Sequence, residues 1–107
     1  MRCISIAAAT VLALLVQPAT AQQSGDAARG LELARQWCAD CHVIRKGEGR
    51  SASDAAPTFP SIAAMRSTTR ATLLVFLQTP HRQMPNLALS RTDISDLAEH
   101  IIGLRGQ

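Results

Sequence analysis

The 107-residue chain is poor in aromatic side chains, with one Trp, two Phe and no Tyr. A domain of this size buries only about 60% of the surface of its unfolded chain and is marginally stable by itself. So few large rings leave little to fill a core. We therefore expect a metal or a large cofactor to supply the missing apolar bulk.

Other absences exclude whole classes of function. The sequence has no basic run with interleaved aromatics and a net charge of only +3, so we expect no nucleic-acid binding. It also has no paired-carboxylate set and no nucleophile–base constellation, so we do not expect an enzyme. A small positive excess suits brief docking on acidic protein surfaces instead.

The one long apolar run lies at the N-terminus. Met1-Arg2 gives a positive start, residues 3–16 are almost wholly apolar, and Ala19-Thr20-Ala21 provides the small residues of a cleavage site. This pattern predicts a signal peptide over residues 1–21 and export to the periplasm. The run is shorter than the roughly 20 residues of a spanning helix, so we expect no stable membrane insertion after cleavage. Residues 22–107 then form a single domain.

Apolar spacing, capping residues and prolines predict short helices joined by loops. No segment has a convincing strand pattern, so the sequence predicts an all-α fold of three or four short helices. The expected helices are 26–41, 60–65, a third that begins after Ser67 or Thr68 and ends near Gln78, and a last one that Ser90 caps.

The run Cys38-Ala39-Asp40-Cys41-His42 carries the chemistry. Its two thiols and its imidazole stand at positions i, i+3 and i+4, which share one face of a helical turn. Each thiol can add to one vinyl group of a haem, and the adjacent imidazole can reach the iron. This C-x-x-C-H spacing predicts covalent attachment of one c-type haem, with His42 as an iron ligand.

Three alternatives use the same residues. Cys38 and Cys41 could oxidise to a simple disulfide. They could form a thioredoxin-like redox pair, although such a pair expects strands around it. They could also bind zinc with His42 and one distant His, although no second cysteine pair remains once Cys3 leaves with the signal.

Several further segments complete a family resemblance. Gly30 precedes the C-x-x-C-H run in the first helix, Ala56-Pro57-Thr58-Phe59 resembles a proline loop beneath the haem, and Gln83-Met84-Pro85 resembles an axial-methionine loop. The chain thus resembles the small class I cytochromes c of bacteria over nearly all of residues 22–107. The resemblance implies a cytochrome c-like fold packed around one haem c.

The resemblance also implies roles for two loop residues. The second ring nitrogen of His42 should donate to a backbone carbonyl, which the resemblance assigns to Pro57. Met84 is the expected distal ligand, because a thioether favours the ferrous state. Met65 is the alternative thioether, although its helical pattern favours core packing, and His81 is the alternative nitrogen ligand.

Two positions depart from the family pattern. The glycine of the first helix usually packs against an aromatic of the last helix, and His100 stands at that position here. Ala34 replaces a common aromatic in the first helix, and we expect Trp37 to supply that bulk.

These residues together predict a periplasmic single-electron carrier with His42 and Met84 as axial ligands. Its partners would be periplasmic redox proteins such as a dehydrogenase, a cytochrome complex or an oxidase. The sequence leaves open whether the chain is a free carrier or a subunit of a larger redox enzyme. The alternative function is a haem protein with an open or displaceable distal site, which would bind a small ligand as a sensor or enzyme subunit.

Overall fold

A computed structural model describes residues 24–49, 56–81 and 83–107, and the predicted signal peptide lies outside these ranges. Within them the chain forms helices and no strands, which confirms the predicted all-α class. The helices are α1 (Ala27–Trp37), α2 (Phe59–Ala64), α3 (Arg70–Phe76) and α4 (Arg91–Gly103). In the described part no helix is long and apolar enough to cross a bilayer.

Helix α1 begins at the expected place but ends early. The Asp26 carboxylate caps its start by accepting from the backbone N–H groups of Ala28 and Arg29, at 2.8 and 3.1 Å. The prediction of helix through Cys41 was wrong, because α1 ends at Trp37 and Cys38 is its C-cap, with a φ of −118° and a ψ of −27°. Residues 38–41 form turns instead.

The other helices also begin with side-chain caps. Thr58 caps α2, which begins at Phe59, one residue before the predicted range. Thr69 caps α3 in place of the predicted Ser67 or Thr68. The prediction of Ser67 or Thr68 as this cap was wrong, because Thr72, three residues after Thr69, supplies the reciprocal bond of a capping box. Ser90 and Asp93 form the capping box of α4, as expected.

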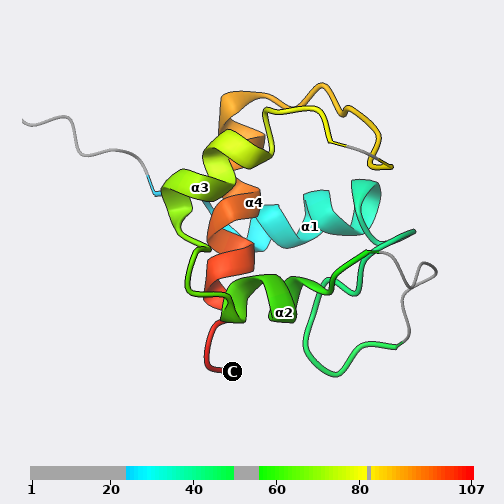
Figure 1. Cartoon of the computed structure of the whole chain (residues 1–107), viewed down its shortest axis with the longest axis vertical. Coiled ribbons are helices and arrows are strands. Elements are labelled where there is room, and N and C mark those ends of the chain that lie inside the picture. Colours follow the sequence, from blue (N-terminus) through cyan, green and yellow to red (C-terminus); the bar gives the residue numbers. More distant parts are fainter. Residues whose placement is uncertain (1–23, 50–55, 82) are drawn as a thin grey trace, which may run out of the picture.

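Helix α4 is the centre of the packing. It crosses α1 and supports both α2 and α3 (Figure 1). The hydrophobic core around α4 consists of ten buried residues: Ala34, Cys38, Ile44, Phe59, Ala63, Leu73, Leu97, Ala98, Ile101 and Leu104. Trp37 is not among them, because its side chain is half exposed, so the expectation that it supplies core bulk was wrong.

Glycine allows α1 and α4 to approach closely. A Cβ added at Gly30 would lie 2.0 Å from the Asp96 carbonyl oxygen and 2.9 Å from Cβ of His100. The family's close approach at this glycine is therefore kept without an aromatic on α4. The His100 ring turns towards the loop after the C-x-x-C-H run, where Nε2 donates to the Ile44 carbonyl oxygen at 2.9 Å.

Candidate haem-binding site

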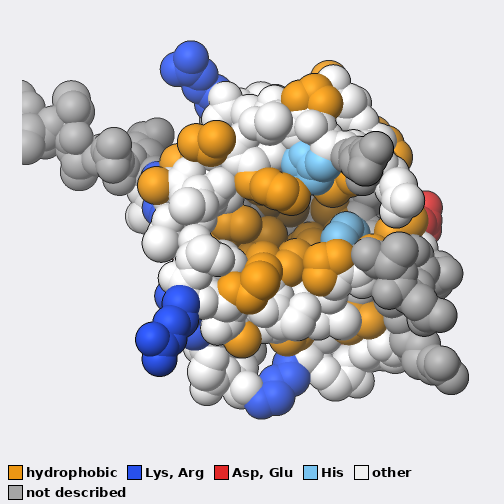
Figure 2. All heavy atoms as spheres, viewed as in Figure 1, with side chains coloured by type: hydrophobic (Ala, Val, Ile, Leu, Met, Phe, Trp, Pro, Cys, Tyr) orange, Lys and Arg blue, Asp and Glu red, His pale blue; other side chains and the backbone are white. Residues whose placement is uncertain are grey.

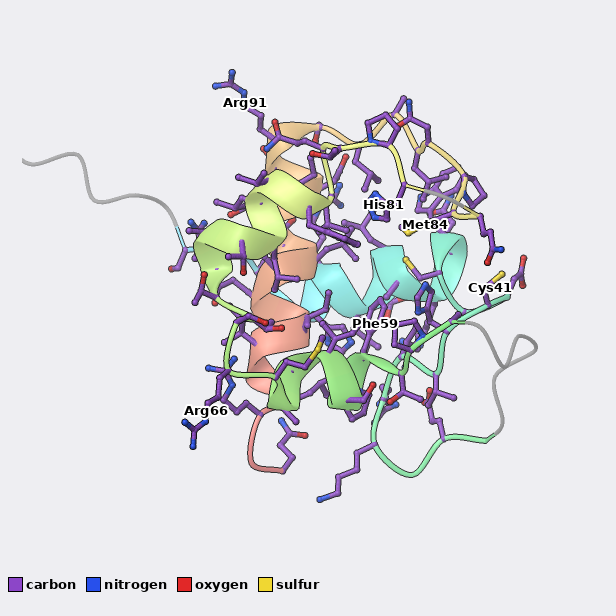
Figure 3. The ribbon with its side chains drawn as sticks, in the orientation of Figure 1. Cys41, Phe59, Arg66, His81, Met84 and Arg91 are labelled. Atoms are coloured by element: carbon purple, nitrogen blue, oxygen red, sulfur yellow. The ribbon has the colours of Figure 1, made fainter. Side chains whose placement is uncertain are left out.

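The C-x-x-C-H residues lie in a tight turn directly after α1. The backbone N–H groups of Cys41 and His42 donate to the Cys38 carbonyl oxygen at 3.1 and 2.9 Å. This bonding keeps the three side chains within one turn although the regular helix has ended. Cys38 is buried, His42 is half-buried and Cys41 is exposed, and Figure 3 shows Cys41 at the outer end of the turn.

All three side chains line one large cavity of about 880 Å³. This volume is at the upper end of the range of about 300–1,000 Å³ for ligand and cofactor pockets. Figure 2 shows it as an apolar hollow with histidine side chains at its margin. Its walls come from the end of α1, from α2 and α3, and from the segment that precedes α4; Trp37, Pro57, Ile62, Leu73, Phe76 and Leu87 are among its apolar lining.

His42 is held in one orientation by two neighbours. Its Nδ1 lies 2.6 Å from the Pro57 carbonyl oxygen, and because a carbonyl only accepts, Nδ1 is the donor. This bond leaves the lone pair of Nε2 available to a metal. The Phe59 ring lies against the imidazole with the ring centroids 5.4 Å apart.

Met84 lines the same cavity from the segment between α3 and α4. Figure 3 shows it reaching inward beside His81, on the side away from Phe59. The preceding residue, Gln83, has a φ of 66°, in the left-handed region that non-glycine residues rarely adopt. Such strained backbone is typical of sites that must hold a side chain in a set position.

The structure thus gathers every predicted site residue at one cavity. Cys38, Cys41, His42, Pro57 and Met84 all line it. The expectation that Met65 packs in the core was wrong, because Met65 is about half exposed and lines the cavity as well. Helix α2 ends at Ala64, so the helical pattern that suggested core packing stops one residue short of Met65.

Sequence reasoning missed the role of Phe59. Its ring is close to two imidazoles, with centroids 5.4 Å from His42 and 6.1 Å from His100. Its backbone N–H donates to the Val43 carbonyl oxygen at 2.9 Å. The signal that could have found it is a lone aromatic two residues after Pro57, in a chain with only two Phe.

The Cys38 thiol does not have the lowered pKa of a reactive cysteine in an exchange pair. Burial raises the pKa of the Cys38 thiol to about 11, so this thiol is protonated at neutral pH. Redox-active C-x-x-C pairs have a cysteine whose pKa is lowered, because the thiolate is the nucleophile. Within the described residues Cys38 and Cys41 form no disulfide.

A zinc site also finds no support. Across the ranges 24–49, 56–81 and 83–107, no three His, Cys, Asp or Glu side chains come together to hold a metal ion. Four ligands would be needed for a structural zinc site. What the cavity offers is two thiols, one oriented imidazole, one thioether and a broad apolar lining, and this donor set fits a haem.

Comparison with known proteins points to the same group. The chain is 40% identical over 82 residues to cytochrome c-552 of Bradyrhizobium diazoefficiens, across 77% of this chain and 78% of that protein. No protein-family model matches the chain. No solved structure matches it either. With an identity of this level over most of both chains, and with a cavity suited to haem, this chain belongs to the small c-type cytochromes.

Proposed function

We propose that this chain is an exported single-electron carrier with one haem c, attached covalently through Cys38 and Cys41 and ligated by His42 and Met84. The observation that carries the proposal is the shared cavity, into which the C-x-x-C-H turn and the Met84 segment bring thiols, imidazole and thioether together. When bound, the haem supplies the one-electron couple of its iron.

The residues around the cavity suit that task. The bond from His42 Nδ1 to the Pro57 carbonyl fixes the imidazole and raises its basicity as a ligand. The Met84 thioether favours the ferrous state. His42 and Met84 would both bind the iron and leave no position for a substrate, and the apolar lining would keep water away from the bound group.

Partners would be periplasmic redox proteins that dock for a short time. Arg66 and Arg91 are exposed, and Figure 3 shows both projecting outward from the edges of the face that holds the cavity. Among the described residues neither has an acidic partner, in contrast with Arg29, Arg35, Arg45 and Arg70. Unpaired cations of this kind favour docking on an acidic surface.

Axial ligation is tested by the thioether-to-iron charge-transfer band of the ferric protein. We expect wild type and Met65→Ala to show this band and Met84→Ala to lose it, because Met84 is the thioether on the iron. Met65→Ala is the matched control, since Met65 is the other thioether at the cavity. A band that survives Met84→Ala contradicts the ligand assignment.

Two further measurements test attachment and the closed site. Haem that stays with the polypeptide after acid denaturation and solvent extraction supports the two thioether bonds, and released haem contradicts them.

A six-coordinate carrier binds carbon monoxide slowly in its ferrous form. Rapid binding by wild type would favour the alternative of a ligand-binding haem protein.

A further inference from the structure

His81 has an unusual environment on the wall of the cavity. Its Nε2 is buried and has no hydrogen-bond partner in the described part of the chain. Its Nδ1 bonds to the Thr79 carbonyl oxygen. The Phe76 ring packs on the imidazole with the centroids 3.7 Å apart. A buried acceptor without a hydrogen-bond partner is destabilising, so such a nitrogen in a folded protein usually has a function.

The bond to Thr79 sets the protonation of the ring. Because the carbonyl only accepts, Nδ1 of His81 carries the proton and Nε2 of the neutral ring holds a lone pair. His42 has the same arrangement, with Nδ1 bound to the Pro57 carbonyl. In metal-binding histidines, one ring nitrogen usually donates a hydrogen bond to a backbone carbonyl and the other nitrogen binds the metal.

The other histidine of the chain is not available in this way. The chain has three histidines, and Nε2 of His100 is already bonded to the Ile44 carbonyl oxygen on the far side of Phe59. His81 and Met84, by contrast, line one cavity and lie three residues apart in the chain. Figure 3 shows them side by side on the same wall.

The backbone of the residue before Met84 is strained. Gln83 precedes Met84 with a φ of 66°, which is costly for a residue with a Cβ. His81 lies three residues before Met84, and its Nε2 would break no hydrogen bond between described residues if it moved to a metal.

From these observations we propose that His81 is a reserve distal ligand, whose Nε2 takes the axial position on the haem iron whenever the Met84 thioether leaves it. This inference rests on the proposed function. The sulfur–iron bond breaks and a nitrogen–iron bond forms, while Nδ1 keeps its proton and no electron is transferred. The centre stays six-coordinate, and its reduction potential falls because the thioether that favoured ferrous iron is gone.

The test uses the holoprotein with four variants: Met84→Ala, His81→Ala, Met84→Ala/His81→Ala and Met84→Ala/Met65→Ala. Electron paramagnetic resonance of the ferric form reports the spin state, and carbon monoxide binding to the ferrous form reports an open position. We expect Met84→Ala to lose the thioether band yet stay low-spin. We expect Met84→Ala/His81→Ala to become high-spin and to bind carbon monoxide at least ten times faster than Met84→Ala.

The remaining variants are controls. His81→Ala should keep the thioether band, because Met84 is still present. Met84→Ala/Met65→Ala should remain low-spin, which shows that the second thioether is not the substitute. Added imidazole should return Met84→Ala/His81→Ala to low spin, which shows that its pocket is folded.

Two results overturn the inference in different ways. If Met84→Ala loses the band but is already high-spin, or if low spin persists without His81, the reserve role is wrong and the ligation by Met84 stands. If Met84→Ala keeps the band, ligation by Met84 is wrong and the reserve role falls with it.

Discussion

The two sides of Phe59 are built in different ways. On the α4 side, an added Cβ at Gly30 would collide with the backbone of α4, so α1 and α4 are in close contact. Ala34 of α1 and Leu97 and Ala98 of α4 are almost completely buried. On the cavity side, large apolar side chains remain about half exposed around a hollow of about 880 Å³; they are Trp37, Met65 and Phe76.

This difference separates what the polypeptide stabilises by itself from what it leaves to the haem. A chain with so few aromatics cannot fill both halves. It closes one half with small residues in close contact and leaves the other open for a large apolar group. The cavity wall is thus unfinished core, and the haem completes it in our proposal.

The largest expected effect comes from removing one phenylalanine ring from each of the two halves. Phe59 is 4% exposed and Phe76 is 53% exposed. We expect Phe59→Ala to lower the free energy of unfolding of the holoprotein by about 3 to 5 kcal/mol, because it leaves a cavity in the packed half. Phe76→Ala should cost at least about 2 kcal/mol less, because less of this ring contacts protein. Denaturant unfolding measures both, and equal costs would mean that the bound haem makes the cavity wall as tight as the core.

The helix crossing is tested with a pair of glycines. Gly30→Ala would place a Cβ 2.0 Å from the Asp96 carbonyl oxygen, so α1 and α4 must move apart. We expect a loss of about 3 kcal/mol in unfolding free energy. At Gly103, in α4, an added Cβ meets nothing within 4 Å, so Gly103→Ala should be neutral or stabilising. A Gly30→Ala variant as stable as Gly103→Ala would show that the crossing tolerates separation.

The start of α4 contributes a smaller amount. The Ser90 hydroxyl accepts from the Asp93 backbone N–H at 3.1 Å, and its loss leaves that donor without its cap. We expect Ser90→Ala to lower the unfolding free energy by about 1 kcal/mol. Thr92 is exposed on the same turn, and Thr92→Ala should change stability by less than about 0.5 kcal/mol. An equal effect of both variants would exclude the cap as the cause.

The smallest effect depends on pH. Hydrogen bonds from Ser90, with a contribution from Arg29, hold the pKa of Asp93 below the ordinary carboxyl value. The folded pKa is the lower one, so the carboxylate stabilises the fold above the ordinary value and this contribution is lost as the pH falls through the lowered pKa. We expect the stability gap between wild type and Asp93→Asn to be widest near neutral pH and to shrink below about pH 4. A gap that stays constant into acid would contradict this linkage.

Local signals predicted much of the fold. They also predicted five residues that line the candidate site, Cys38, Cys41, His42, Pro57 and Met84, but neither the contact of Phe59 with His42 nor the place of Met65. The Ser90–Asp93 capping box and the apolar stripe of α4 depend only on nearby residues, and both are present in the structure. The C-x-x-C-H run and the Met84 loop fall on one cavity as expected. Their roles toward haem remain predictions.

The features that the sequence did not predict depend on contacts between distant segments. Trp37 and Met65 have apolar side chains that suggest a core, yet both line the cavity, because the space that would bury them is left for another group. The early end of α1 has the same origin, since the turn at Cys38 carries its residues to the cavity instead of onward along a helix. Single-residue propensities contain no information on a cofactor that completes the fold.

The three consecutive residues after the second cysteine each form a hydrogen bond with a different residue further along the chain. His42 bonds to the Pro57 carbonyl, the Val43 carbonyl accepts from Phe59, and the Ile44 carbonyl accepts from His100. The Met84 segment, on the opposite wall, is joined to neither Phe59 nor His100 by any hydrogen bond between described residues. A designer who wished to change the chemistry of this cytochrome could therefore exchange the segment between α3 and α4 for a different loop and leave the attachment side untouched.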